Sequence, residues 1–274
     1  MTQQQDWVPQ DVDTSVPNVA RTYDFLLGGA HNFAVDRAFA EQVEKALPGS
    51  RHMARVNRAF MARAVRAMVA DGVRQFLDVG AGIPTVGNVH EIAQAAVPEC
   101  RVAYVDKDPI AVAHSELLLM GDDRAVAAQA DLRDVASVLD APAVRGLLDF
   151  EEPIGVLMLL VLHWVPDDAD PHRLLAGYID RLAPGSMVAI SHVTETDEST
   201  GTVEEMRGLV KRSQARDSLT YRGYDEVVGL FAGLDLVEPG VVGAGLWRPD
   251  GPGAVADDPE ANTVIYAGVG RKTG

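Results

Sequence analysis

A glycine-rich turn at residues 76–82 has the composition of a ligand-binding loop. It reads Phe-Leu-Asp-Val-Gly-Ala-Gly, an apolar run that predicts a buried strand and ends in two closely spaced glycines. Glycine adopts positive φ and has no Cβ, so the backbone of such a turn can lie close to a bound molecule. Because any turn between a strand and a helix can carry Gly-x-Gly for structural reasons, a second signal is needed before the turn indicates a ligand.

Asp106 supplies the second signal. It ends the next predicted strand, 24 residues beyond Gly82. A carboxylate at this place can accept hydrogen bonds from both hydroxyls of a ribose. The alternative is that Asp106 caps the helix predicted to begin at Pro109, but Asp108, which directly precedes Pro109, is the better candidate for that cap. The turn and Asp106 together therefore predict a nucleoside-type ligand.

The residues of the turn disfavour a dinucleotide. The Gly-x-Gly-x-x-Gly pattern of NAD and FAD sites needs a third glycine where Thr85 stands, and Pro84 removes a backbone donor near the turn. The carboxylate of Asp78 repels a phosphate but attracts a cation. S-adenosylmethionine carries an ammonium and a sulfonium group and no phosphate, so the charges in this segment favour it as the ligand.

Alternating strands and helices after Gly72 are predicted to hold these residues in place. Short apolar runs predict the strands Gln75–Val79, Arg101–Val105, Ala125–Gln129, Ile154–Leu160, Met187–His192, Leu234–Val237 and Thr263–Gly268. The helices predicted between them are Val86–Ala96, Pro109–Leu119, a region near Val135–Leu148, Pro171–Leu182, Thr202–Ala215 and Tyr224–Ala232. This pattern is typical of a doubly wound, mostly parallel α/β sheet covered on both faces, whose strands form a ligand crevice at their carboxyl ends.

The residues before Gly72 have a different, helical pattern. Residues 1–17 are polar and acidic and predict a flexible tail. Apolar residues at helical spacing predict the helices Asn18–Leu27, Val35–Leu47 and Ser50–Asp71. We expect residues 18–71 to form an N-terminal helical cap on the sheet. No linker-like composition separates the two parts, so residues 18–274 are predicted to be a single domain.

Several longer stretches of the chain resemble one protein family. They are Val19-Ala-Arg-Thr-Tyr-Asp-Phe-Leu-Leu-Gly-Gly-Ala-His-Asn-Phe, Arg55-Val-Asn-Arg-Ala-Phe, Gln75-Phe-Leu-Asp-Val-Gly-Ala-Gly-Ile-Pro-Thr, Tyr104-Val-Asp-Lys-Asp-Pro, Gln129-Ala-Asp-Leu-Arg-Asp and Leu162-His-Trp-Val-Pro-Asp-Asp. With them the chain resembles the S-adenosyl methyltransferases of actinobacteria, a family first described as a domain of unknown function, within the Rossmann-fold S-adenosylmethionine-dependent methyltransferases. The resemblance implies a Rossmann-like sheet of about seven strands, the last one antiparallel. Pro84 stands where the broader group often has a third glycine. The narrower family also has Pro-Thr at this place, so the proline is a family trait.

The resemblance also implies which residues hold the cofactor. It assigns Asp78, Gly80, Ala81, Gly82, Asp106, Lys107, Asp131, Leu132, Leu162 and His163 to the binding of S-adenosylmethionine. By this assignment the turn borders the methionine part and Asp106 holds the ribose. Asp131 and Leu132 frame the adenine. Leu162 and His163 lie near the transferred methyl group.

Two residues are candidates for the chemical step. A general base assists methyl transfer to a hydroxyl or an ammonium group, and His163 stands at the carboxyl end of a predicted strand, where a base is needed. The alternative for His163 is a structural hydrogen bond to a neighbour. Tyr23 is a candidate for orienting the acceptor.

Two further segments are candidates for covering the site. The polar residues around Gly28-Gly29 predict a lid over the cofactor, and they are Arg21, Tyr23, Asp24, His31 and Asn32. The alternative is ordinary helix capping together with a pair between Arg21 and Asp24. Trp247, in a loop before the last predicted strand, is a candidate for stacking on a flat acceptor, with hydrophobic packing of that loop as the alternative.

The composition disfavours several classes of partner. The 274 residues carry 24 Lys and Arg against 40 Asp and Glu, a formal charge of −16, which disfavours nucleic acid and anionic membranes. The single cysteine predicts a protein without internal disulfides. The N-terminus lacks a signal-peptide pattern and the apolar runs are too short to span a bilayer, which predicts a cytoplasmic protein. No cluster of His, Asp or Glu has the spacing of a metal site.

These observations predict an enzyme that moves the sulfonium methyl of S-adenosylmethionine to a small-molecule acceptor. One alternative is a regulatory protein that binds S-adenosylmethionine or its demethylated product, S-adenosylhomocysteine, without catalysis. A nicotinamide-dependent reductase is a further alternative, against which the glycine spacing argues. The sequence names no acceptor and leaves the oligomeric state open.

Overall fold

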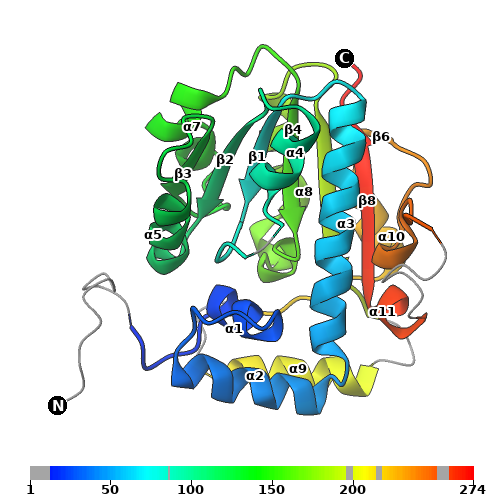
Figure 1. Cartoon of the computed structure of the whole chain (residues 1–274). Coiled ribbons are helices and arrows are strands. Elements are labelled where there is room, and N and C mark those ends of the chain that lie inside the picture. Colours follow the sequence, from blue (N-terminus) through cyan, green and yellow to red (C-terminus); the bar gives the residue numbers. More distant parts are fainter. Residues whose placement is uncertain (1–12, 86, 196–199, 214–217, 252–258) are drawn as a thin grey trace.

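One sheet forms the centre of the molecule (Figure 1). The computed structural model describes residues 13–85, 87–195, 200–213, 218–251 and 259–274, so most of the predicted tail lies outside the described residues. Within these ranges eight strands pair in the order β3-β2-β1-β4-β5-β8-β6, and β7 pairs with β8. The strands are β1 (Gln75–Val79), β2 (Arg101–Asp106), β3 (Ala125–Gln129), β4 (Ile154–Leu159), β5 (Met187–Val193), β6 (Asp235–Leu236), β7 (Val242–Gly243) and β8 (Ile265–Arg271).

The pairing confirms a mostly parallel sheet whose last strand is antiparallel. β1 lies between β2 and β4, and the pairs among β1 to β5 are all parallel. β8 runs antiparallel to β5 along its whole length. Because parallel strands end at the same edge, the segments that follow β1, β2, β3 and β4 come together at the carboxyl edge of the sheet.

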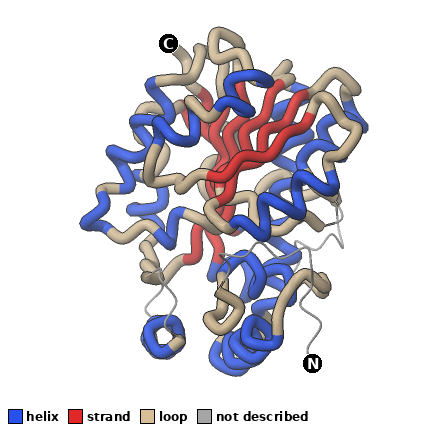
Figure 2. Tube along the Cα trace, turned by 90° about the vertical axis from the view of Figure 1, so that its left-hand side faces the viewer, coloured by secondary structure: helices blue, strands red, loops and turns tan. Residues whose placement is uncertain are grey.

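Helices cover both faces of the sheet, as the apolar strands predict (Figure 2). Every residue of β1 is buried. One face packs on α3 (Ser50–Ala70), α4 (Val89–Ala96) and α5 (Pro109–Leu118). The other face packs on α6 (Val135–Leu139), α7 (Pro142–Leu147), α8 (Pro171–Asp180) and α10 (Tyr224–Gly229). No helix within the described ranges is both long and apolar enough to cross a membrane.

A helical cap lies against the carboxyl edge of the sheet. It contains α1 (Val19–Leu26), α2 (Ala34–Ala46) and the first turns of α3, which runs from the cap along the sheet (Figure 1). Asn18 begins α1 by accepting hydrogen bonds from the backbone N–H of Ala20 at 2.7 Å and of Arg21 at 3.3 Å. The guanidinium of Arg21 pairs with Asp36 at 3.1 Å, and both side chains are buried, so the pair holds α1 against α2.

The cap differs from the predicted one by an additional helix. α9 (Thr200–Arg212), which the sequence pattern placed among the layers of the sheet, packs beside α2. Val43 of α2 and Met206 of α9 belong to one buried cluster. The cap therefore combines α1, α2 and the first turns of α3 with a helix from far along the chain, while the rest of the predicted cap, the body of α3, packs on the sheet.

Smaller differences from the predicted elements have local causes. The region near Val135–Leu148 is two helices, α6 and α7, because Pro142 begins a new helix at its first position. α4 begins at Val89, after the cap residue Asn88, and the predicted start at Val86 lies outside the described residues. The short strand β7 and the helix α11 (Pro259–Val264) were not predicted.

Candidate active site

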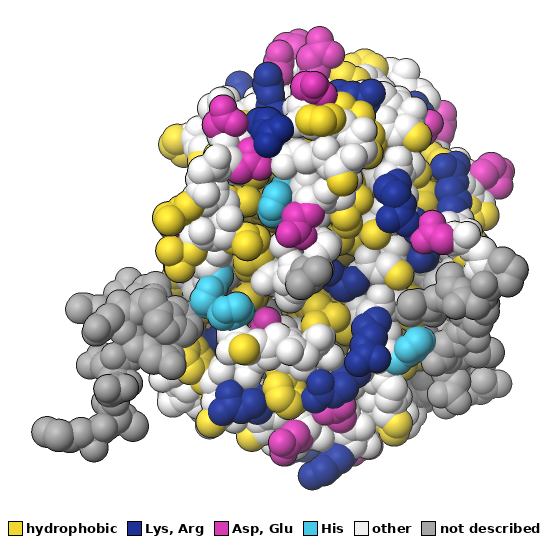
Figure 3. Space-filling view, viewed as in Figure 1, with side chains coloured by type: hydrophobic (Ala, Val, Ile, Leu, Met, Phe, Trp, Pro, Cys, Tyr) yellow, Lys and Arg dark blue, Asp and Glu magenta, His cyan; other side chains and the backbone are white. Residues whose placement is uncertain are grey.

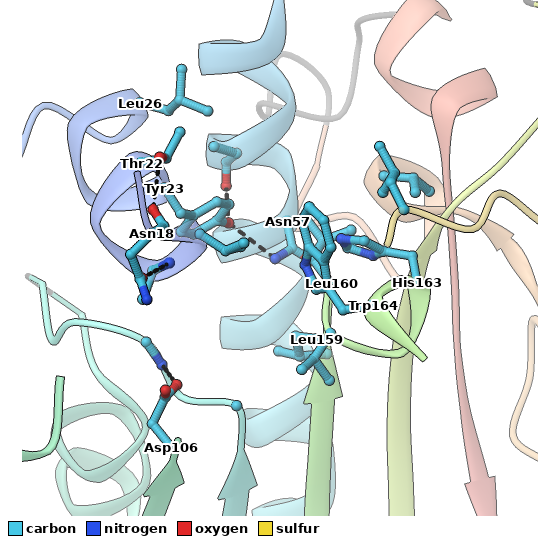
Figure 4. Close-up of a pocket in the computed structure, with 18 of the residues that line it drawn as sticks. Asn18, Thr22, Tyr23, Leu26, Asn57, Asp106, Leu159, Leu160, His163 and Trp164 are labelled. Carbon is cyan, nitrogen blue, oxygen red and sulfur yellow. Dashed lines mark hydrogen bonds between the residues drawn. The ribbon is translucent and has the colours of Figure 1, made fainter. Parts of the chain in front are cut away.

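A cavity lies between the carboxyl edge of the sheet and the cap (Figure 4). Its sheet side is lined by the turn after β1, the ends of β2 and β3, and the loop after β4. Its cap side is lined by residues of α1, α2, α3 and α9. Of the predicted cofactor residues, the cavity brings together Asp78, Gly80, Ala81, Gly82, Asp106, Lys107, Asp131, Leu132 and His163.

The two glycines of the turn are required for different reasons. Gly80 and Gly82 have positive φ of 72° and 66°. A Cβ on Gly80 would lie 2.4 Å from Cγ2 of Val161, so the turn packs directly on the loop after β4. A Cβ on Gly82 would have Ala20 as its nearest neighbour at 4.0 Å, so that position is open toward α1. The backbone conformation, more than crowding, therefore selects glycine at position 82.

The carboxylate of Asp106 fixes the turn from the end of β2. It accepts a hydrogen bond from the N–H of Gly82 at 2.7 Å and one from the N–H of Asp108 at 2.8 Å. Each carboxylate oxygen has a further lone pair for a ligand. Burial raises the pKa of Asp106, and these two backbone donors lower it. Asp108 caps α5 through the N–H of Ile110 at 3.0 Å, the role that the sequence predicts for it.

Asp78 places a second buried carboxylate next to the turn. Burial raises the pKa of Asp78 to about 7, the nearby guanidinium of Arg58 lowers it, and the charge of Asp106 raises it further. Arg58 comes from α3, lines the same cavity and donates to the carbonyl of Gly87 at 2.8 Å. Arg58 was not among the predicted site residues.

The end of β3 contributes a carboxylate of different character. Asp131 binds Arg133 through Nε at 2.9 Å, which lowers the pKa of Asp131. The carbonyl of Leu132 accepts a hydrogen bond from the hydroxyl of Tyr178 at 2.8 Å, which ties this loop to α8. Arg133 also lines the cavity and was not among the predicted site residues.

The loop after β4 turns two polar rings into the cavity. His163 and Trp164 line it, whereas the side chain of Leu162 is fully buried in the core and does not reach it (Figure 4). Nδ1 of His163 and Nε1 of Trp164 are buried without a hydrogen-bond partner. His163 is 5% exposed, and burial together with His192 and Arg222 lowers its pKa well below the usual value, so its ring is neutral near pH 7.

A buried arginine that the sequence did not single out holds this loop. Arg222 donates to the carbonyls of Leu162 at 3.1 Å and Val165 at 2.8 Å, and to the carboxylate of Asp167 at 2.7 Å. Arg222 also contacts Nε2 of His192 at 2.8 Å. The other ring nitrogen of His192, Nδ1, lies 2.5 Å from the carbonyl oxygen of Val193. Nδ1 is therefore the protonated nitrogen of His192 and Nε2 accepts from Arg222. No local pattern marks Arg222, because its partners lie 30 to 60 residues away.

Tyr23 reaches the cavity from the cap. Its hydroxyl donates to the carbonyl of Ala54 at 3.2 Å and accepts from Nδ2 of Asn57 at 3.1 Å. Asn57 in turn accepts from the hydroxyl of Ser191 at 2.6 Å, so hydrogen bonds join β5, α3 and α1 across the site. Burial raises the pKa of Tyr23, which keeps the phenol protonated. Asn57 was missed, although a polar residue on the apolar stripe of its helix is a usable signal.

The remaining predicted lid residues have structural roles. Arg21 pairs with Asp36 and not with Asp24. Asp24 accepts from the N–H of His31 at 2.9 Å and from Nδ2 of Asn32 at 2.8 Å, which shapes the turn between α1 and α2. None of the four predicted residues Arg21, Asp24, His31 and Asn32 lines the cavity. The reason is that these polar side chains make hydrogen bonds and an ion pair within α1, α2 and the segment that joins them.

Trp247 packs in the core and does not line the cavity, contrary to the prediction that it stacks on an acceptor. It is fully buried and packs edge-on against Phe60 with ring centroids 5.5 Å apart. Nε of Arg63, on α3, donates a hydrogen bond to the backbone carbonyl of Trp247 at 2.8 Å. The loop is thereby fixed against α3, away from the cavity, so Trp247 does not stack on an acceptor.

The described residues contain no group of His, Cys, Asp or Glu that could hold a metal ion. At one end of the cavity the carboxylates of Asp78 and Asp106 can bind cationic and hydroxyl groups. At the other end lie the neutral rings of His163 and Trp164.

Comparison with known proteins places the chain in a family. Two crystal structures cover nearly all of it. One is of a protein of Thermobifida fusca YX described provisionally as a methyltransferase, 37% identical over 98% of this chain and 100% of that one, with a TM-score of 0.90. The other is of a DUF574 family protein of Streptomyces avermitilis MA-4680, 35% identical over 95% of this chain and 99% of that one, with a TM-score of 0.88.

Among proteins with curated descriptions, none matches the sequence. The family model described as S-adenosyl methyltransferase matches residues 5–273, almost the entire chain. The cavity, with a glycine turn after β1 and an acidic residue at the end of β2, lies where an α/β sheet of this topology binds its ligand. The chain therefore belongs to the S-adenosyl methyltransferase family, and its cofactor is S-adenosylmethionine.

Proposed function

We propose that this protein transfers the methyl group of S-adenosylmethionine to a small molecule bound in the same cavity. The observation that carries the proposal is that one cavity joins the carboxyl ends of β1, β2 and β3 to the loop after β4 and to the cap. The cofactor then lies over the strand ends and the acceptor lies on the side of the cap. The two molecules meet beside His163.

The buried charges support this placement of the cofactor. A pKa of about 7 indicates that the negative charge of Asp78 is poorly stabilised by the protein alone. The ammonium group of the methionine part would supply the positive charge that stabilises it. Asp106 already orients the turn and can accept the ribose hydroxyls through its remaining lone pairs. Asp131 and Leu132 then border the adenine, and Lys107, which directly follows Asp106, also lines the cavity.

The protein's part in the reaction is positioning, exclusion of water and acceptance of a proton. S-adenosylmethionine supplies a methyl carbon whose bond to sulfur breaks with the electron pair left on sulfur, while a lone pair of the acceptor forms the new bond to that carbon. The cap helices exclude water from the reacting atoms, and Tyr23 and Asn57 fix α1 over them. His163 is neutral and within the cavity, so its imidazole takes the proton of an acceptor hydroxyl and passes it to water.

Titration calorimetry tests the cofactor site. Wild-type protein should bind S-adenosylmethionine and S-adenosylhomocysteine and give no heat with NADPH. Asp106→Ala should weaken both affinities about 10- to 100-fold, because lost hydrogen bonds of a buried carboxylate cost about 1–3 kcal/mol. Asp123→Ala is the matched control, since the side chain of Asp123 is 99% exposed. Absence of heat with both sulfur compounds would overturn the proposal.

A further inference from the structure

The cap side of the cavity has apolar walls. We call this part the acceptor chamber and define it by Leu26, Phe39, Val43, Leu47, Met53 and Met206, which all line the cavity. These side chains come from α1, α2, α3 and α9 and from the residue that ends α2. The chamber therefore depends on helices that are far apart in the sequence, held together by the buried cluster that contains Val43 and Met206.

Charge is scarce in the chamber. Among the lining residues that the structure describes on these four helices, Arg58 is the one charged side chain. Arg58 lies at the other end of the cavity, close enough to Asp78 to lower its pKa. An ionised acceptor would thus lose its hydration without gaining a partner, whereas an uncharged one would not. The chamber therefore selects uncharged molecules.

Three polar atoms on residues that line the cavity are buried and have no hydrogen-bond partner. They are Nδ1 of His163, Nε1 of Trp164 and Oγ of Ser50, each on a residue that lines the cavity. His163 and Ser50 are 5% and 6% exposed. Buried polar groups are nearly always hydrogen-bonded, so the acceptor is expected to supply the partners. A hydroxyl group can accept from Trp164 and donate to His163.

The chamber also favours an aromatic ring. Tyr23, Phe39, Trp164 and Tyr221 line the cavity, although aromatic residues make up only 6% of the chain. Aromatic faces and edges stack on a ring at low entropic cost. Methionine sulfurs, such as that of Met206, make favourable contacts with ring edges.

We propose that the methyl acceptor is an uncharged aromatic molecule that presents a phenol-type hydroxyl to His163 from the acceptor chamber. This inference rests on the proposed function. The phenol oxygen forms the new bond to the methyl carbon and its O–H bond breaks, while sulfur keeps the electron pair of the broken bond. The proton goes to Nδ1 of His163 and from there to water. Because the pKa of His163 is low, its ring assists a phenol, which ionises near pH 10, better than an aliphatic alcohol.

Three bicyclic probes of one size test the inference: naphthol, naphthoate and the saturated alcohol decahydronaphthol. Each is titrated into protein loaded with S-adenosylhomocysteine, and formation of that product is then measured with S-adenosylmethionine and each probe. Naphthol should bind at least tenfold tighter than the other two and should raise product formation above the rate without acceptor. Tighter binding of naphthoate, or no binding of naphthol to the loaded protein, would overturn the inference. Failure of S-adenosylhomocysteine to bind would instead overturn the proposed function.

A charged variant of the chamber wall separates the acceptor from the cofactor. Met206→Lys should weaken naphthol binding at least tenfold and change the affinity for S-adenosylhomocysteine less than twofold, because Met206 lies on the cap side. Met206→Leu is the matched control and should retain both affinities. If the lysine variant fails to fold, Val43→Thr, which keeps the shape of valine, should weaken naphthol about threefold. Unchanged naphthol affinity in a folded variant contradicts the assignment of the chamber.

Discussion

Asp78 illustrates how a single residue can be kept for a ligand at the expense of stability. It is buried at the end of β1, and burial raises its pKa to about 7. Because the pKa is higher in the folded than in the unfolded chain, Asp78 favours folding only while it is protonated. That contribution is complete below the unfolded pKa near 4 and is lost as the pH rises to about 7. Binding of an ammonium group offsets this loss.

Asp78→Asn should therefore stabilise the protein in the absence of cofactor. We expect the gain over wild type to be about 2 kcal/mol larger at pH 8 than at pH 5, because the neutral amide does not ionise. Chemical denaturation at the two pH values measures it. The same variant should bind S-adenosylmethionine at least tenfold more weakly, since the ammonium loses its counter-charge. A variant that is destabilised equally at both pH values contradicts this view of Asp78.

At the scale of elements, the loop after β4 depends on contacts with a residue about 60 positions further along the chain. Arg222 is 2% exposed and reaches Leu162, Val165, Asp167 and His192 with one guanidinium. It holds the backbone on both sides of His163 without touching the cavity. Arg222 is thus a positioning residue for His163 and Trp164.

Arg222→Met should lower the free energy of unfolding by about 2–5 kcal/mol, since it leaves buried acceptors unpaired. The pKa of His192, which is about 4 in the wild type, should rise as the neighbouring guanidinium is removed. Ring nitrogen shifts in NMR spectra report both the pKa and the protonated nitrogen of His192. Arg181→Met, which removes an exposed pair with Asp140, is the control and should change stability by less than about 1 kcal/mol. An unchanged His192 spectrum would contradict the role of Arg222.

Local patterns in the sequence predicted the elements that hold the cofactor better than those that hold the acceptor. The strand β1, its turn and Asp106 are contiguous signals, because strand burial and glycine conformation are read from neighbouring residues. The contact of Met206 with α2 joins segments about 160 residues apart, and no spacing rule encodes it. The direction of Trp247 was equally undetermined, because packing of its loop on α3 decides whether the ring faces a ligand or the core.

At the scale of the whole molecule, a strongly acidic sequence presents at least one face of mixed charge (Figure 3). The net charge is −16, yet basic and acidic side chains intermingle on the face shown in Figure 3, with hydrophobic side chains among them. The sheet and the cap enclose the cavity between them, and in the proposed arrangement the strand ends hold the cofactor and the helices hold the acceptor. If this arrangement holds, substitutions in the cap change the acceptor specificity and leave the cofactor site unaltered.

A crystal structure with bound S-adenosylhomocysteine would show whether the cofactor occupies this cavity in the proposed orientation. We expect both ribose hydroxyls within hydrogen-bond distance of the Asp106 carboxylate, the amino group beside Asp78 and the sulfur facing His163. A ligand bound outside the cavity, or one whose ribose lies away from Asp106, would contradict this expectation.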